Sequence, residues 1–223
     1  MPIDAVLFDL DDTLLDHGGA AAAAITGAFP GGPAWLAARW TELVDESVDR
    51  YLSGELTWPD QRRYRITRLA RELGLGEWDA ARADAWFAAE YVPRYEAAWR
   101  AFPDVEPALA ALAGRRLGVI TNGYEPQQRG KLRRLGLAGA LPYLLASSTA
   151  GAAKPAPEIF RTACAELGLP PERVAYVGDR LATDAVGATE AGLYGVWLDR
   201  PGSGGAADVP RITSLAELPD LLG

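Results

Sequence analysis

Carboxylates stand at two places in the sequence where apolar segments end. Asp9 and Asp11 close the apolar run at residues 3–10, and Asp179 closes a second run, with Asp184 following it. Two carboxylates two positions apart at the end of a strand repel each other unless a cation or a proton relieves the repulsion. The pattern therefore predicts a divalent metal ion. Each of these residues taken alone has a simpler explanation. Asp9 could lie in a solvated acidic turn, and Asp184 could be an acidic residue in the first turn of a helix, where the helix dipole favours it.

A third segment could bind an anion. Thr121, Asn122 and Gly123 end the strand-like run at residues 117–122 and bring a hydroxyl, an amide and flexible backbone into one turn. Such a turn can donate side-chain and backbone hydrogen bonds to an anion. Asn-Gly also occurs in ordinary turns, so this segment indicates an anion site only when it is taken together with the acidic segments and Lys154.

The two lysines of the chain need separate interpretations. Among 22 basic residues, only Lys131 and Lys154 are lysine. Lys154 precedes a helix that we expect to begin at Pro157, where a cation gains nothing from the helix dipole. A lysine here, in so arginine-rich a chain, indicates that a compact ammonium is needed, for example between a phosphate and a carboxylate. Lys131 lies in the basic segment QQRGKLRR, and we interpret it as a solvated surface residue.

Alternating strand and helix patterns would place these residues at one edge of a sheet. Strand-like runs recur along the chain, at residues 3–10, 117–122, 143–147, 173–179 and 195–199. Helical patterns lie between the later ones, at residues 104–113, 125–135, 157–167 and 183–191. This alternation predicts an α/β fold with a doubly wound parallel sheet, which binds ligands at the carboxyl ends of its strands.

A helical insert interrupts the alternation after the first strand. Residues 17–98 show apolar residues at helical spacing and no convincing strand. We expect about four helices, near residues 19–28, 33–53, 58–73 and 77–98. Six of the seven tryptophans fall in or beside this insert, and amphipathic helices usually bury such side chains in their own core rather than against an aromatic substrate. Two domains follow: 1–16 with 99–223 as an α/β core, and 17–98 as an all-helical domain.

Length and composition narrow the class of protein. The chain has 223 residues, of which 49% are apolar and 23% charged, as is typical of a globular protein with a sizeable core. Its net charge of -8 argues against binding to nucleic acid or to anionic membranes. No apolar run reaches the roughly 18 residues of a membrane span, and the start MPIDAVLFDLDDTLLD has no basic region of a secretory signal. We expect a cytoplasmic protein whose single cysteine, Cys164, is an inert core thiol.

In chain order, the polar segments resemble the four motifs of the haloacid dehalogenase superfamily. They are Asp-x-Asp-x-Thr from Asp9, Thr-Asn-Gly from Thr121, Lys-Pro at Lys154, and Gly-Asp-(four residues)-Asp from Gly178 to Asp184. The helical insert resembles the cap domain that follows the first strand in that superfamily. Within the superfamily, the segments ITNGYEPQQRGKLRRLGL and AKPAPEIF resemble sequences of the branch that holds N-acylneuraminate-9-phosphatase and pyrimidine 5′-nucleotidases.

The resemblance implies catalytic and metal-binding roles for the acidic residues. Asp9 would be the nucleophile that forms an aspartyl-phosphate. Asp11 would protonate the leaving oxygen and then activate water. Asp9, Asp179 and the backbone carbonyl of Asp11 would bind Mg²⁺ directly, while Asp184 would lie outside these ligands or act through a water. An all-oxygen site is what Mg²⁺ prefers.

The resemblance also implies a phosphate site and a strand order. Thr121 and the backbone of Asn122 and Gly123 would hold the phosphoryl oxygens, and Lys154 would neutralise charge on the phosphate and on Asp9. The parallel sheet would be Rossmann-like, with the strand order 3-2-1-4-5 and the inserted all-helical cap after its first strand.

These roles predict a Mg²⁺-dependent phosphomonoester hydrolase that acts on a small phosphorylated metabolite. A phosphomutase would keep the same motifs, and a catalytically inactive small-molecule-binding homologue is a third alternative. A 2-haloacid dehalogenase needs no metal and has no acid two residues after its nucleophile, so Asp11 argues against it. A phosphonatase would need a cap lysine, which residues 15–98 do not contain.

The substrate and partners are predicted only in outline. His17 and Gly18, at the junction with the cap, are candidates for selecting the leaving group, although an exposed polar residue before a helix would explain His17 equally well. Gly18 and Gly19 could serve as a hinge for closure of the cap. We expect no nucleic-acid or membrane partner, and a monomer or a homodimer.

Overall fold

The computed structural model describes residues 2–205 and 207–223, which fall into two compact units. The α/β unit contains the chain up to Asp16 together with Ala101–Gly223, and the helical unit is His17–Arg100. Each unit has its own cluster of buried apolar side chains. The two units are therefore described separately.

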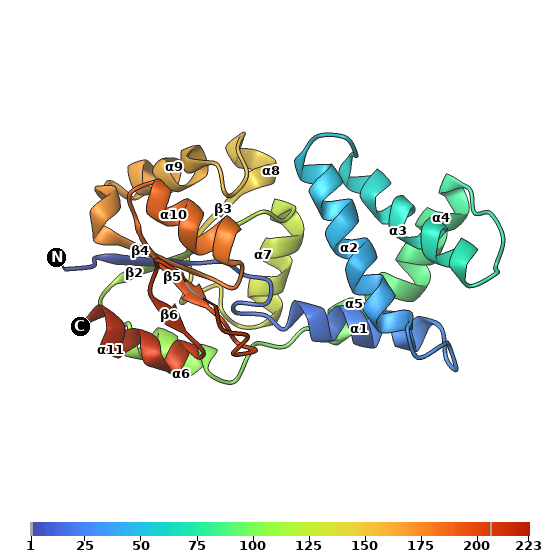
Figure 1. The fold of residues 1–223 in the computed structure, drawn as a ribbon, viewed down its shortest axis with the longest axis horizontal. Coiled ribbons are helices and arrows are strands. Elements are labelled where there is room, and N and C mark those ends of the chain that lie inside the picture. Colours follow the sequence, from blue (N-terminus) through green and yellow to red (C-terminus); the bar gives the residue numbers. More distant parts are fainter. Residues whose placement is uncertain (1, 206) are drawn as a thin grey trace. The chain divides into compact units, whose positions relative to one another are not determined.

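A parallel sheet of six strands, in the order β3-β2-β1-β4-β5-β6, organises the α/β unit (Figure 1). The strands are β1 (Ala5–Phe8), β2 (Arg116–Thr121), β3 (Tyr143–Ala146), β4 (Val174–Gly178), β5 (Tyr194–Leu198) and β6 (Arg211–Ile212). The predicted α/β class and the order of the first five strands are confirmed. The sixth strand was not expected, because two residues are too few to show a strand pattern.

Helices cover both faces of this sheet. They are α6 (Val105–Ala111), α7 (Glu125–Arg134), α8 (Ser147–Ala150), α9 (Pro157–Leu167), α10 (Gly187–Glu190) and α11 (Leu218–Leu222). Helices α9 and α10 lie on one face, and α6 and α11 lie on the other (Figure 1). Strand β1, at the centre, is completely buried, because it has a strand on each side and helices above and below. Among the described residues, no helix combines the length and the apolar character that crossing a membrane would require.

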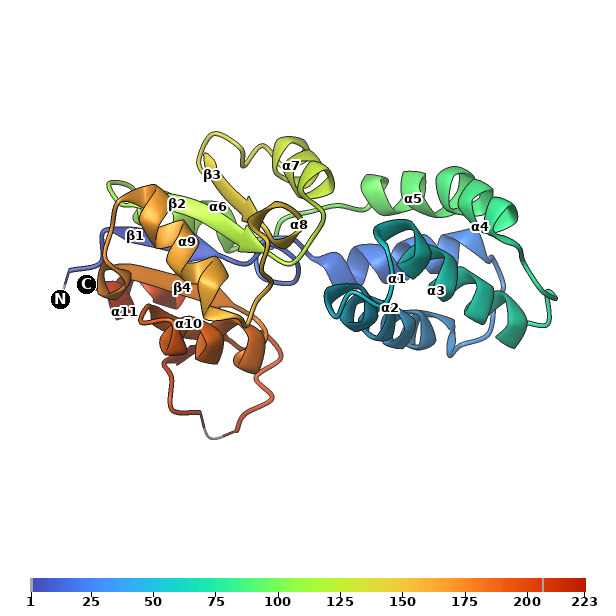
Figure 2. The ribbon, with the colours of Figure 1, turned by 90° about the horizontal axis from the view of Figure 1, so that it is seen from above.

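The helical unit consists of helices joined by short loops. They are α1 (His17–Ala28), α2 (Leu36–Leu52), α3 (Trp58–Glu72), α4 (Ala80–Trp86) and α5 (Val92–Ala97), with a π-helical turn (Phe87–Tyr91) between the last two. Helix α2 packs against α1 and α3, and α5 packs against α1 (Figure 2). The residues expected to form a fourth helix are thus α4, the π-helical turn and α5.

Aromatic side chains fill the centre of the helical unit. Trp40 is completely buried, and its indole N–H donates to the Tyr91 hydroxyl at 3.0 Å. Trp86 stacks on Phe29 and Tyr91. These tryptophans therefore have the core role that the sequence favoured, whereas Trp35 is 44% exposed.

Candidate active site

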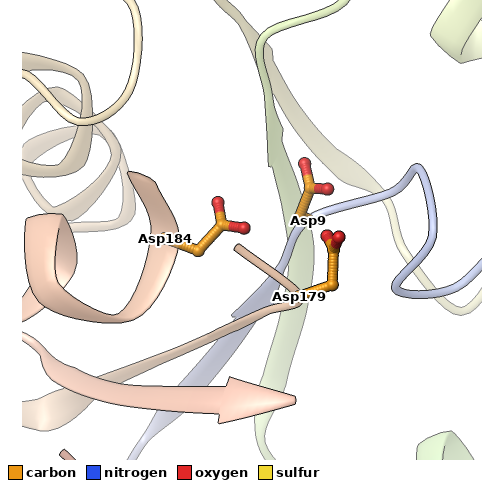
Figure 3. Close-up of side chains that lie close together, drawn as sticks. All are labelled: Asp9, Asp179 and Asp184. Atoms are coloured by element: carbon orange, nitrogen blue, oxygen red, sulfur yellow. The ribbon is translucent and has the colours of Figure 1, made fainter. Parts of the chain in front are cut away.

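Three carboxylates meet at the carboxyl edge of the sheet. Asp9 and Asp179 follow β1 and β4, which are paired with Phe8 opposite Val177, and Asp184 lies in the π-helical turn Leu181–Val186 after β4. Each of the three side chains offers an oxygen within 4.8 Å of the others. Figure 3 shows the three carboxylates facing a common space. Residues far apart in sequence come together because parallel strands end at the same edge.

Lys154 binds two of these carboxylates. Its buried ammonium donates to Asp9 Oδ1 and to Asp184 Oδ1, each at 2.7 Å. It also donates to the Tyr176 hydroxyl at 2.7 Å, which in turn donates to the Ile120 carbonyl at 2.9 Å. All three acceptors surround one point charge, an arrangement that suits an ammonium and would not suit a planar guanidinium.

Burial and crowding shift the proton equilibria of this site. Burial raises the pKa of Asp9 to about 8, opposed by Lys154 and reinforced by Asp184 and Asp179. Burial, followed by the charge of Asp184, raises the pKa of Asp179 to about 7. Burial opposes the charge of Lys154, but Asp184 and Asp9 outweigh it and raise its pKa above the ordinary value. One ammonium therefore does not balance the negative charge of three carboxylates.

The residues present fit a divalent metal ion. Asp9, Asp179 and Asp184 supply hard carboxylate oxygens, the ligands that Mg²⁺ prefers. A cation of charge +2 would also relieve the repulsion that raises the pKa of Asp9 and of Asp179. Asp9 and Asp179 would hold the ion directly and Asp184 would act beside them or through a water, because its two oxygens already accept from Lys154 and from the Arg180 backbone N–H. The charge of the ion would stabilise a phosphoryl group beside Asp9.

The Thr-Asn-Gly segment, residues 121–123 at the end of β2, forms hydrogen bonds with the backbone of Lys154. The Asn122 side-chain amide donates to the Lys154 carbonyl at 2.9 Å, and its oxygen accepts from the Lys154 backbone N–H at 2.8 Å. Thr121 Oγ1 accepts from the Gly123 backbone N–H at 3.1 Å. The side chain of Asn122 thus positions Lys154, a role that the turn pattern alone did not reveal.

Lys131 is not a surface residue, and the interpretation made from its basic segment is wrong. It is 2% exposed, and its ammonium lies 2.6 and 2.8 Å from the two carboxylate oxygens of Asp11. Gln128, one turn earlier on α7, donates from Nε2 to Asp11 Oδ2 at 3.0 Å and to Thr121 Oγ1 at 2.8 Å. Helix α7 directs one face at the end of β2, so Gln128 and Lys131 point inward while the neighbouring arginines face solvent.

Two glycines are required by close packing around these groups. A Cβ atom at Gly178 would lie 2.4 Å from Asp184 Cγ, and one at Gly123 would lie 2.4 Å from Gln128 Nε2. Neither distance is possible for a real side chain, so glycine is needed for Asp184 and Gln128 to reach the site. Thr13 is fully buried, and its hydroxyl donates to Asp179 Oδ1 at 3.3 Å.

Tyr176, Gln128 and Lys131 are the residues of this site that the sequence did not identify. Tyr176 lies in a strand with an apolar sequence pattern, and this pattern does not indicate that its hydroxyl belongs to the site. For Lys131 a signal existed, because it is one of only two lysines in a chain rich in arginine. The signal for Gln128 is its spacing of three residues before Lys131, which places both on one helix face.

The residues expected to select the leaving group lie in the other unit. His17 and Gly18 are in the first turn of α1. The His17 Nδ1 atom is 2.6 Å from the Tyr95 hydroxyl, and the two rings meet edge to face. His17 is therefore held by the helical unit's own aromatic residues.

Comparison with known proteins agrees with this geometry. Residues 3–192 match the family model of haloacid dehalogenase-like hydrolases. The chain belongs to this family. This membership confirms the resemblance inferred from the four motifs and identifies the protein as a hydrolase.

Curated relatives of this hydrolase include several phosphatases. A glyceraldehyde 3-phosphate phosphatase from Methanopyrus kandleri is 35% identical over 89% of this chain and 84% of its own length. A phosphoserine phosphatase from Thermus thermophilus is 34% identical over 72% of this chain and 68% of its own length. N-acylneuraminate-9-phosphatase and pyrimidine 5′-nucleotidase, the branch that the sequence suggested, are also among the relatives.

A solved structure has the same fold over the full length of the chain. The magnesium-bound HAD-hydrolase YfnB from Bacillus subtilis superposes with a TM-score of 0.86 and covers 100% of this chain and 99% of its own. Its sequence is 24% identical to this one. The likeness therefore concerns the fold alone.

Proposed function

We propose that this hydrolase is a Mg²⁺-dependent phosphatase that cleaves the monoester of a small phosphorylated metabolite. The observation that carries the proposal is the pair of short contacts from Lys154 to Asp9 and Asp184 beside the Asp179 carboxylate. Its phosphatase relatives support the same class of substrate. A bound Mg²⁺ would supply positive charge for the phosphoryl oxygens and for Asp9.

The reaction proceeds in two displacements at phosphorus. A carboxylate oxygen of Asp9 attacks phosphorus, the ester P–O bond breaks, and the Asp11 carboxyl gives its proton to the leaving oxygen. Asp11 then takes a proton from water, the hydroxide oxygen bonds to phosphorus, and the bond to Asp9 breaks to release phosphate. Lys154 opposes the protonation of Asp9 and orients it, and Lys131 and Gln128 orient the Asp11 carboxylate.

A phosphomutase is the alternative that uses the same residues. It differs only in the fate of the aspartyl-phosphate, which a mutase transfers to a second hydroxyl of the substrate instead of to water. A 2-haloacid dehalogenase does not require an acid at position 11, and here Asp11 is held by two side chains of α7.

We propose further that residues 17–98 act as a cap that selects the leaving group. Only the phosphoryl group would be bound by the α/β residues described above, so the rest of the substrate must be recognised elsewhere. His17 and Gly18, at the start of this segment, belong to that role in the proposal. Its hinges would be at residues 17–19 and 99–103.

Trapping the intermediate tests the mechanism directly. Enzyme turning over p-nitrophenyl phosphate with Mg²⁺ is quenched and reduced with borohydride, which converts an aspartyl-phosphate to homoserine. We expect homoserine at position 9 by mass spectrometry, and no turnover in excess chelator. Turnover with Asp9 unmodified, or full activity in chelator, would overturn the proposal. Product analysis with a diol monophosphate distinguishes release of phosphate from its transfer by a mutase.

A further inference from the structure

Tyr176, in the middle of β4, is a polar residue of the α/β core to which the proposed mechanism gives no part. It is completely buried, so its hydroxyl meets neither solvent nor a substrate. Its ring meets that of Phe160 on α9 edge to face, with the ring centres 5.1 Å apart. A phenylalanine would supply the same apolar packing, so the hydroxyl needs an explanation of its own.

The Tyr176 hydroxyl is held from the interior of the sheet. It donates to the Ile120 carbonyl at 2.9 Å and lies farther, at 3.4 Å, from Asp184 Oδ1. Ile120 belongs to β2 and Tyr176 to β4, and β1, which leads to Asp9, lies between these two strands. The hydroxyl therefore connects the two strands that flank the one leading to the proposed nucleophile. With its proton used in the bond to Ile120, its oxygen is left to accept a hydrogen bond.

The Lys154 ammonium has as many acceptors as it has N–H bonds. An ammonium carries three donors, and those of Lys154 meet Asp9 Oδ1, Asp184 Oδ1 and the Tyr176 hydroxyl, each at 2.7 Å. Three acceptors fix the position of the nitrogen, whereas two would leave it free to turn about the line that joins them. The hydroxyl is the uncharged acceptor of the three, so Tyr176 adds to the geometry of the site without adding to its charge.

Loss of the hydroxyl would leave one N–H of Lys154 as a buried donor without its acceptor. A buried donor without an acceptor is costly, so the ammonium would turn towards another acceptor. That movement would change its distances to Asp9 and Asp184. A small displacement of a group that orients the reacting atoms slows the reaction even when the substrate still binds.

We propose that Tyr176 is a positioning residue, which holds Lys154 where its ammonium contacts Asp9 and Asp184 at the same time. Because Tyr176 has no exposed surface, it acts on the reaction through Lys154 and not by touching the substrate. The proposal rests on the phosphatase function proposed above. It concerns the step in which Asp9 attacks phosphorus.

Single-turnover kinetics test this role. Tyr176→Phe removes the hydroxyl and keeps the ring, and release of p-nitrophenolate from p-nitrophenyl phosphate with Mg²⁺ and enzyme in excess reports attack by Asp9. We expect the maximal rate to fall by about tenfold or more, and the enzyme concentration that gives half this rate, which reports binding, to change by less than about twofold. Tyr143→Phe is the matched control, because the Tyr143 hydroxyl at the start of β3 donates to Glu166 at 2.8 Å, outside the site. It should behave as the wild type.

The two lysines of the chain allow a measurement without turnover. Protein labelled with ¹⁵N at its lysine ammonium groups should give two NMR signals, from Lys131 and Lys154, both of which are buried. Lys131→Met identifies the Lys131 signal. Tyr176→Phe should shift the Lys154 signal and leave that of Lys131 in place, and Tyr143→Phe should shift neither. In the wild type, a nuclear Overhauser effect should connect the Lys154 ammonium protons with the Tyr176 ring.

The two measurements together decide the proposal. A shifted Lys154 signal with an unchanged single-turnover rate would overturn the positioning role, and equal shifts of both lysine signals would show that Tyr176 is only structural. If Tyr176→Phe does not fold, Tyr176→Met replaces it, because methionine fills irregular apolar space, and the same outcomes decide. If the wild type turns over no phosphate ester, the phosphatase proposal is overturned, whereas a selective shift of the Lys154 signal would still support Tyr176 as the residue that fixes Lys154.

Discussion

The α/β unit and the helical unit treat their buried cations differently. In the α/β unit, Lys154 is shared by Asp9 and Asp184, and Lys131 contacts both oxygens of Asp11. In the helical unit, Arg65 is buried to a similar degree and has the neutral Gln61 as its hydrogen-bond partner. The buried cations of the two units are thus exposed to a similar degree, but among the described residues only those of the α/β unit have a carboxylate as their partner.

The pairing in the α/β unit suits carboxylates that take part in a reaction. A reactive carboxylate must be held in place before the substrate arrives, so its cation is part of the folded protein. Substitutions and pH changes at the α/β site test this requirement.

Replacing the nucleophile should have the largest effect. Asp9→Asn is nearly isosteric but cannot form the aspartyl-phosphate, so we expect kcat to fall by at least about 10⁴-fold. Circular dichroism should show an unchanged fold, and Asp220→Asn, at an exposed carboxylate on α11, serves as the control. Retention of activity within about tenfold, a loss of only ~1.4 kcal/mol, would contradict covalent catalysis by Asp9.

Removing the partner of Asp11 should have an intermediate effect. Lys131→Met removes one of the two α7 side chains that orient Asp11 and leaves the other, Gln128. We expect kcat to fall by about 10- to 100-fold. The loss should be greater for alkyl than for p-nitrophenyl esters, because a poor leaving group depends more on the proton. Arg133→Met, an exposed neighbour on α7, should behave as the wild type. Equal losses for both esters would show that Lys131 does not act through proton transfer.

The pH dependence of stability is a third property that depends on the α/β site. The pKa of Asp9 is raised from 3.8 to about 8 and that of Asp179 from 3.8 to about 7, so the folded state holds protons that the unfolded state has lost. Stability from these groups is therefore fully present below about pH 4 and is lost as pH rises towards 8, by at most about 1.4 kcal/mol per pH unit for each proton.

Urea denaturation in chelator at pH 5.5 and pH 8 measures this loss. Mg²⁺ should stabilise the protein more at pH 8 than at pH 5.5, because it binds the deprotonated carboxylates. Asp9→Asn removes one of the two protons and should flatten the dependence. A pH profile identical to that of the wild type in this variant would show that Asp9 does not carry the shifted pKa.

Much of the site could be predicted because its residues follow strands. Asp9, Thr121 and Asp179 each end an apolar run, and parallel strands bring such ends together whatever their separation along the chain. Lys131 could not be placed in this way. Its neighbours are arginines that face solvent, and the face of a helix that points inward depends on how the helix packs.

The sequence by itself determined where the first five strands, the helical insert and the motif residues at the strand ends lie along the chain, because these depend on local apolar patterns and on spacing, whereas the strand order followed from the resemblance to the superfamily. Only the tertiary structure showed that Lys131 and Gln128 hold Asp11, that Tyr176 contacts Lys154, and that Arg65 is buried without a carboxylate. Such contacts join side chains far apart in the chain, and a side chain's partners depend on which residues the packing brings within a few ångströms of it.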